Sequence, residues 1–104
     1  MNNSIKPVDI HVDEVTSSAS YRIIDIRTSE EVKLHPLTLR HEHIPMDQLL
    51  QTKDLIKKDE HVVLVCAAGV RTKMTAEAFR KVGYMKVFSL VGGEPALRSH
   101  NLSE

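Results

Sequence analysis

The chain has 104 residues, of which 41% are hydrophobic and 27% are charged, and its 14 Lys and Arg residues balance its 14 Asp and Glu residues. This length suits one domain with a single core, and a formal net charge of zero argues against a nucleic acid or an anionic membrane as the main partner. We therefore expect one domain over residues 5–104, preceded by a disordered tail at residues 1–4.

The first half of the chain predicts two strands and two helices. In chain order the pattern predicts a short strand at 6–10, a short helix at 12–18 and a strand buried on both faces at 21–26. Thr28 and Glu31 fit a capping box, which predicts that a second helix begins there. The segment 34–42 is broken by Pro36 and is compatible with a loop or a short strand.

The second half predicts a stronger alternation of elements. It gives helices at 46–52 and 71–82, strands at 62–65 and 86–91, a turn at Gly92 and Gly93, and a final helical turn at 94–99. In the helix at 71–82 the apolar face is expected to contain Met74, Ala78, Phe79 and Val82, with Gly83 just past its end. Strands that alternate with helices predict an α/β fold with a central parallel sheet of about five strands and helices on both faces.

Cys66 is the single cysteine of the chain, and it follows the apolar strand 62–65 directly. A strand that ends at a thiol, turns through small residues and enters a helix directs backbone N–H groups toward the sulfur, and the helix dipole favours a thiolate there. Arg71 is the obvious neighbouring cation, Gly69 allows a positive φ, and Thr72 can cap the helix or offer a hydroxyl to a bound anion. The alternative is that Cys66 is only a small buried hydrophobic residue.

A single cysteine also bears on the compartment of the protein and on the chemistry that Cys66 can carry out. No internal disulfide can form, which suits a reducing compartment, and we expect a cytoplasmic location. No apolar stretch reaches the length of a membrane span, and the polar start of the chain is unlike a signal peptide. Because no second cysteine can resolve an oxidised Cys66, any sulfur chemistry must finish on another molecule.

Four stretches of the sequence resemble the rhodanese-like sulfurtransferases, in their single-domain form. These stretches are residues 24–27 with 30–32, residues 43–46 with Leu49, the strand and loop at 63–72, and the closing segment 82–93. The resemblance implies a rhodanese-like fold and a catalytic cycle in which Cys66 takes a sulfane sulfur, becomes a persulfide and passes the outer sulfur to an acceptor.

The resemblance also implies a set of binding residues and partners. Besides the catalytic Cys66, the expected substrate-binding residues are Ala67, Ala68, Gly69, Val70, Arg71, Thr72, Asp25 and Arg27. Asp25 and Arg27 would lie near the rim of the cradle or support it, and the alternative is an ordinary internal ion pair. The expected donor is thiosulfate or another small sulfane-sulfur compound, or a protein persulfide, and the acceptor is a thiol or cyanide. No cofactor and no metal site are expected.

Other features of the chain narrow this interpretation. Four residues separate Cys66 from Arg71, one fewer than in phosphatase relatives of the fold, which disfavours phosphatase and arsenate chemistry. Ala67 and Ala68 are neutral, which makes a protein or low-molecular-weight persulfide as good a donor as thiosulfate. His41 and His43 are interpreted as loop histidines. The alternative function is a rhodanese-like binding or regulatory module without turnover.

Overall fold

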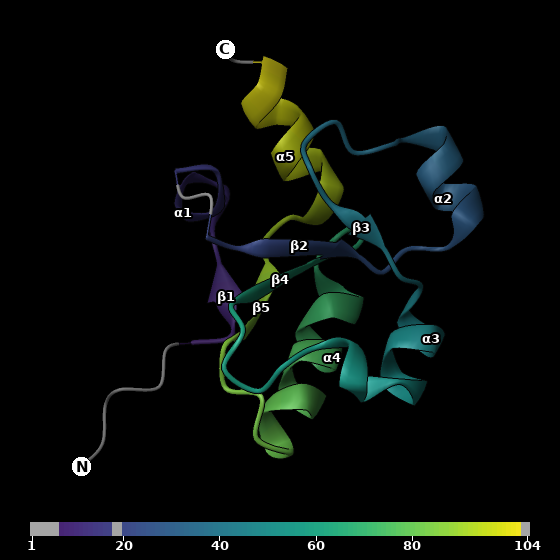
Figure 1. Cartoon of the computed structure of the whole chain (residues 1–104). Helices are drawn as coiled ribbons and strands as arrows, with labels where there is room; N and C mark the ends of the chain where they lie inside the picture. The colour runs from purple at the N-terminus through teal and green to yellow at the C-terminus, as the bar shows by residue number, and fades with distance from the viewer. Residues whose placement is uncertain (1–6, 18–19, 103–104) are drawn as a thin grey trace.

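A five-stranded sheet lies between two layers of helices in the computed structural model, which describes residues 7–17 and 20–102 (Figure 1). The strands are β1 (Asp9–Ile10), β2 (Arg22–Asp25), β3 (Glu42–His43), β4 (Val62–Val65) and β5 (Val87–Leu90). The helices are α1 (Val12–Thr16), α2 (Ser29–Leu34), α3 (Met46–Gln51), α4 (Val70–Lys81) and α5 (Gly93–Leu102), with a 3-10 turn η1 at Lys53–Leu55. The tail predicted at residues 1–4 lies outside the described residues, and the extent of the domain stays a prediction.

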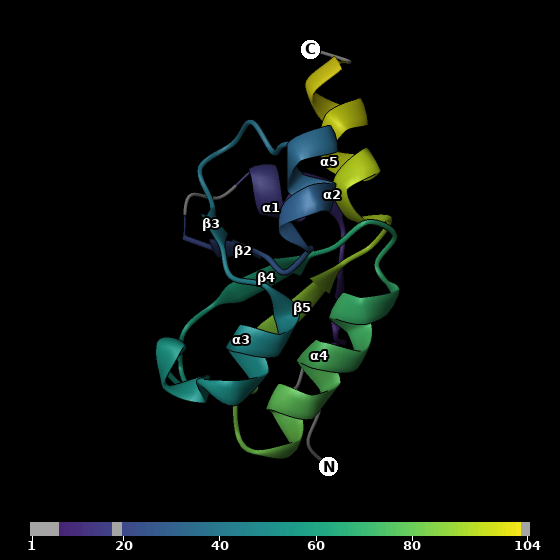
Figure 2. The same ribbon diagram turned by 90° about the vertical axis from the view of Figure 1, so that its right-hand side faces the viewer.

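All strand pairs are parallel, and the strand order is β1-β5-β4-β2-β3. Figure 2 shows α1, α2 and α5 on one side of the sheet and α3 and α4 on the other. The prediction of an α/β fold with a five-stranded parallel sheet is therefore confirmed. Because the carboxyl ends of parallel strands meet at one edge, the residues after β2 and β4 come together there.

Strand β4 at the centre of the sheet divides its side chains between two cores. Val62 and Leu64 pack in the cluster that includes Leu49 of α3 and Phe79 of α4. Val63 and Val65 pack in the opposite cluster with residues of α1 and α5. All four β4 residues are 0% exposed, and burial of each side chain stabilises the fold by about 1.5–3 kcal/mol.

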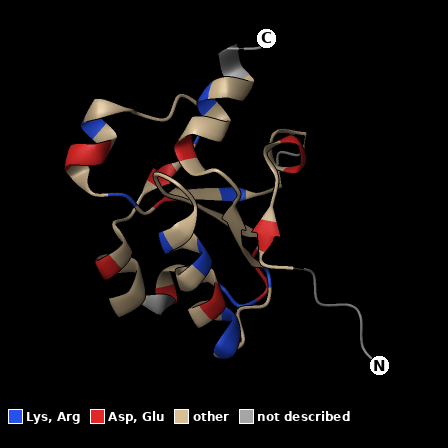
Figure 3. Ribbon diagram, turned by 180° about the vertical axis from the view of Figure 1, so that it is seen from behind, with Lys and Arg blue, Asp and Glu red and all other residues tan. Residues whose placement is uncertain are grey.

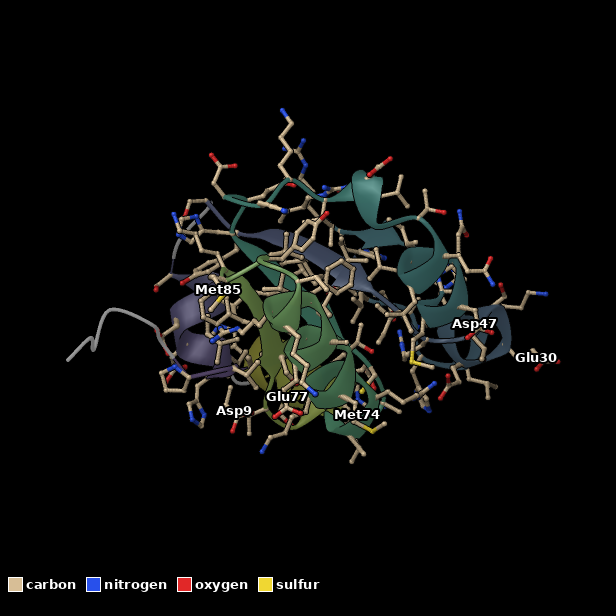
Figure 4. All side chains as sticks on the ribbon, turned by 90° about the horizontal axis from the view of Figure 1, so that it is seen from below. Asp9, Glu30, Asp47, Met74, Glu77 and Met85 are labelled. Atoms are coloured by element: carbon tan, nitrogen blue, oxygen red, sulfur yellow. The ribbon has the colours of Figure 1, made fainter. Side chains whose placement is uncertain are left out.

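The predicted apolar face of α4 is right at Phe79, which is 0% exposed, but wrong at Met74 and Val82. Met74 is 65% exposed and Val82, just after the helix, is 49% exposed, and Figure 4 shows Met74 on the outer side of α4. The buried residues are instead Thr72, Thr75, Ala76 and Phe79, at helical spacing. Hydrophobicity alone misses this face because two of its four members are threonines whose hydroxyls find hydrogen-bond partners inside the protein.

The segment that the sequence left open, residues 34–42, runs as a loop into the edge strand β3. Arg27 Nη2 donates to the backbone oxygen of His35 at 2.7 Å, and Arg98 Nη1 lies 3.1 Å from His35 Nδ1. The segment then joins the sheet, since Glu42 pairs with Ile24 in the parallel register of β2 and β3. Arg27, just after β2, and Arg98 of α5 thus hold the start of the loop that leads to β3.

The C-terminal part of the chain is more helical than predicted. The helix α5 covers Gly93–Leu102, whereas only a turn at 94–99 is expected from the sequence. Leu97 is 4% exposed and packs against the sheet. Lys and Arg lie interspersed with Asp and Glu on the side of the molecule that Figure 3 shows. Within residues 7–17 and 20–102, none of the helices is both long and apolar enough to cross a membrane.

Candidate active site

Cys66 lies directly after β4, under the first turn of α4. The Gly69 N–H donates to Cys66 Sγ at 3.1 Å, and the Thr72 hydroxyl lies 3.5 Å from the same sulfur. Gly69 has φ +92° and occupies the N-cap position of α4, so the turn uses the positive φ that the sequence allows at this glycine. The loop thereby wraps around the sulfur, and Cys66 is only 1% exposed.

The surroundings of the sulfur favour the thiolate. Burial raises the pKa of the Cys66 thiol, but hydrogen bonds from the Thr72 hydroxyl and from the backbone N–H groups of Thr72, Ala68 and Gly69 lower it. The net effect is a Cys66 pKa below its usual value, which increases the fraction of reactive thiolate near neutral pH. Ala67 and Val70 of the same loop are exposed.

Arg71 is bound by the carboxylate of Glu31, which lies forty residues before it in the sequence. Both of its Nη atoms donate to Glu31 of α2, at 2.9 and 2.8 Å. The hydrogen bonds from Arg71, followed by the backbone bond from Thr28, lower the pKa of Glu31 to about 2. The guanidinium is also close enough to Cys66 for the charge of the sulfur to raise the Arg71 pKa, although Glu31 is the larger cause. The positive charge beside the sulfur is therefore already balanced by a negative one.

The same Glu31 completes the capping box that the sequence predicts. Its carboxylate accepts from the Thr28 N–H at 3.0 Å, and its own N–H donates to the Thr28 hydroxyl at 3.2 Å. The capping box places Glu31 in the first turn of α2 from sequence alone. Its pairing with Arg71, forty residues away, depends on how α2 packs beside the loop, which no local pattern contains.

Asp25 and Arg27 form a buried ion pair at the end of β2. Arg27 Nη2 lies 2.8 Å from Asp25 Oδ2, and the two side chains are 2% and 0% exposed, respectively. Arg27 also binds the His35 carbonyl, and the Arg27 carbonyl oxygen lies 2.7 Å from His43 Nε2. The Asp25 carboxylate and the Arg27 guanidinium are thus both bound to partners inside the protein. The sequence left open a place at the rim or in support of the cradle and, as the alternative, an ordinary internal ion pair. The geometry fits the internal ion pair, and a role of Asp25 and Arg27 in substrate binding stays a prediction.

Helix α5 begins against the backbone of the loop that follows Cys66. The Glu94 N–H donates to the Cys66 carbonyl oxygen at 2.8 Å. A Cβ atom at Gly93 would overlap that oxygen and would lie 2.8 Å from the Ala67 carbonyl carbon and the Ala68 nitrogen. The sequence predicts a turn at this glycine. The structure shows that its missing side chain also lets α5 approach the loop, a close contact that only the fold reveals.

A hollow of about 320 Å³ opens beside the loop. Its lining includes Ala68, Gly69, Val70, Ser89 and Gly92. A second hollow of about 740 Å³ is lined by Arg22, Ile23 and Glu42, and so lies at the amino ends of β2 and β3, the opposite end from Cys66. Within the described ranges, no group of three His, Cys, Asp or Glu side chains is arranged to hold a metal ion. Of these two hollows, the one beside the loop lies at the same end of the sheet as Cys66, but Cys66 is not among its lining residues.

Comparisons with known proteins agree with this geometry. The profile of the Rhodanese-like domain family matches residues 11–100. Uncharacterized protein YqhL of Bacillus subtilis (strain 168) is 38% identical over 79 residues, which cover 72% of this chain and 61% of YqhL. The crystal structure of a rhodanese-like domain protein from Staphylococcus aureus is 29% identical with a TM-score of 0.74, and the match covers 86% of this chain and 89% of that one.

A second solved structure comes from a larger protein. The NAD-dependent persulfide reductase of A. fulgidus is 31% identical with a TM-score of 0.66, and the match covers 84% of this chain but 15% of the reductase. The chain spans between 43% and 61% of the length of the curated relatives that it matches. The similarity therefore concerns the domain around Cys66, and the activities of the longer relatives belong to those proteins.

Proposed function

Since the chain belongs to the rhodanese-like domain family, we propose that it is a sulfurtransferase that carries a sulfane sulfur on Cys66. One observation carries the proposal. The Cys66 sulfur, at the carboxyl end of β4, receives a hydrogen bond from the Gly69 N–H and lies within reach of the Thr72 hydroxyl. Donors grouped in this way stabilise a thiolate before the reaction and a persulfide anion after it.

The reaction divides into two displacements on sulfur. In the first, the Cys66 thiolate attacks the outer sulfur of a donor R–S–SH. The donor S–S bond breaks with its electron pair on the inner sulfur, which takes the proton and leaves as R–SH, while Cys66 becomes Cys–S–S⁻. In the second, an acceptor such as a thiolate or cyanide attacks the outer sulfur, and the Cys66 thiolate is released. The acceptor must be another molecule, because the sequence contains no second cysteine.

The charge around the site favours a persulfide as the donor. Thiosulfate is a dianion, and it needs a positive charge that is free to attract it. Arg71 is the cation that the loop offers, and both of its Nη atoms are engaged by Glu31. We therefore propose that the physiological donor is a persulfide, on a small molecule or on a protein, acting in the cytoplasm.

Removal of the negative charge on Glu31 is expected to change the choice of donor. Glu31→Gln keeps a side-chain oxygen for the capping box but leaves the charge of Arg71 unbalanced. We expect kcat/KM for thiosulfate to rise about threefold to tenfold, and kcat/KM for cysteine persulfide to change less than about twofold. Initial rates with each donor and a fixed concentration of cyanide measure both values.

Glu30→Gln is the matched control for this experiment. Glu30 is the neighbouring carboxylate of α2, is exposed and points away from the protein (Figure 4). Glu30→Gln changes the net charge by the same amount as Glu31→Gln, and it should leave kcat/KM for both donors unchanged. An equal rise in thiosulfate activity in both variants would show a long-range charge effect, and no rise in Glu31→Gln would remove the reason for preferring a persulfide.

Steady-state kinetics test the proposed cycle itself. The initial rate is measured against donor concentration at several fixed acceptor concentrations. A covalent intermediate on Cys66 predicts parallel lines in the double-reciprocal plots of these rates. Lines that intersect would mean that both substrates are bound at once, which contradicts the cycle. An absence of turnover with every donor would instead favour the alternative of a binding or regulatory module.

A further inference from the structure

Ser89 places a hydroxyl in the middle of a buried strand. The other members of β5, Val87, Phe88 and Leu90, are apolar, and Ser89 itself is 1% exposed. A hydroxyl that is buried without a partner costs free energy, so its partners indicate why it is present. Ser89 Oγ lies 2.7 Å from Thr72 Oγ1 and 3.4 Å from the Gly69 carbonyl oxygen.

The two hydroxyls form a chain that ends at the reactive sulfur. Thr72 Oγ1 lies 3.5 Å from Cys66 Sγ and is 2.7 Å from Ser89 Oγ on its other side. Thr72 is 0% exposed, so water does not compete for its hydroxyl. Each hydroxyl has one hydrogen to donate, and the direction of the first bond therefore fixes the direction of the second.

The direction of this chain depends on the charge of the sulfur. A thiolate can only accept, so Thr72 must donate to it, and Ser89 must then donate to Thr72. When the sulfur is a thiol, Thr72 can donate to Ser89 instead, and Ser89 can donate to the Gly69 carbonyl. A hydroxyl that accepts one hydrogen bond donates a stronger one, by about 10–30%. Ser89 thus strengthens the bond from Thr72 to the sulfur only when the sulfur is negative.

We propose that Ser89 is a positioning residue that directs the Thr72 hydroxyl toward the Cys66 sulfur and so stabilises the thiolate. The proposal deepens the proposed function and rests on it only in taking Cys66 as the reacting group. The hydrogen bonds from Ser89 to Thr72 and from Thr72 to Cys66 stabilise the thiolate before it takes up sulfur.

Within the part of the chain that the structure describes, charged groups of α2, α4, α5 and the end of β2 around the loop form ion pairs. Arg71 of α4 binds Glu31 of α2, and Asp25 binds Arg27 at the end of β2. Glu94 at the start of α5 forms an ion pair with Arg98 at 3.4 Å. The Ser89 hydroxyl bonds to Thr72 and the Gly69 carbonyl, and its removal leaves these charged pairs in place.

Titration of the thiolate in Ser89→Ala tests the proposal. Cys66 is the single cysteine of the sequence, so the ultraviolet absorbance of a thiolate reports it alone at pH values below the titration of tyrosine. We expect the apparent Cys66 pKa to rise by about half a unit, and the rate of alkylation by iodoacetamide at neutral pH to fall about threefold. Ser89→Thr, which restores a hydroxyl, should return both values to those of the unmodified chain.

Thr75→Val is the matched control. Thr75 is buried on the same helix as Thr72, but its hydroxyl donates to the Arg71 carbonyl oxygen at 2.7 Å and not to the sulfur. The apparent Cys66 pKa in Thr75→Val should therefore equal that of the unmodified chain. An unchanged titration in Ser89→Ala, or an equal shift in Thr75→Val, would overturn the proposal. Neither measurement needs a sulfur donor, so a failure of sulfur transfer in the unmodified chain would count against the proposed function and not against the role of Ser89.

Discussion

Cys66→Ser is expected to abolish sulfur transfer, with a fall in kcat/KM of at least about a thousandfold for every donor. A serine hydroxyl has a much higher pKa than a thiol and stays protonated, so it neither attacks sulfur nor holds one as a persulfide. Initial rates of thiocyanate formation from cyanide measure the effect.

The fold should survive this substitution. Serine is close to cysteine in size, and its hydroxyl can accept from the Gly69 N–H that now donates to the sulfur at 3.1 Å. Far-ultraviolet circular dichroism and thermal unfolding serve as the control. A folded Cys66→Ser chain that still forms thiocyanate at the original rate would place the chemistry elsewhere and refute the assignment of Cys66.

Gly93→Ala is expected to damage both stability and the thiol. The added Cβ would overlap the Cys66 carbonyl oxygen and crowd the Ala67 and Ala68 backbone, so α5 and the loop must separate. Overpacking of this kind costs about 1–3 kcal/mol, in addition to about 1–2 kcal/mol for an alanine at positive φ. Because the Glu94 N–H bond to Cys66 would also lengthen, the amide donors around the sulfur should shift and the Cys66 pKa should rise.

Gly83→Ala separates these two effects. Gly83 has φ +102°, against +64° at Gly93, so its conformational cost is at least as large. A Cβ at Gly83 would meet only the flexible Lys58 side chain, at 3.5 Å. Urea unfolding should therefore show a greater loss of free energy of unfolding in Gly93→Ala than in Gly83→Ala, and only Gly93→Ala should slow the alkylation of Cys66. Equal losses in the two variants, with Cys66 alkylated at the original rate in both, would contradict the close contact between α5 and the loop.

The architecture was largely predictable because its signals are local. Apolar runs at 62–65 and 86–91 predicted β4 and β5, and the capping box at Thr28 predicted the start of α2. The position of Cys66 after β4 predicted an amide donor at the sulfur, and Gly69 supplies it. These features depend on the order of residues along the chain, which periodicity and turn chemistry capture.

The rest of the site depends on contacts between distant segments. Arg71 was predicted as the cation beside Cys66, and its ion pair with Glu31 of another helix was not predicted. Thr72 was predicted to cap α4 or to bind an anion, and its hydroxyl instead joins Ser89 of β5 to the sulfur. The buried threonines of α4 could not be found by hydrophobicity, because their burial depends on partners that only the folded chain supplies.

The most direct test of the account is the intact mass of the chain after a single exposure to a persulfide donor and removal of the excess. We predict a gain of one sulfur atom per chain, which disappears when cyanide or a thiol is added and is absent in Cys66→Ser. A chain that gains no sulfur from any donor, or that gains sulfur equally in Cys66→Ser, would contradict the claim that Cys66 carries it.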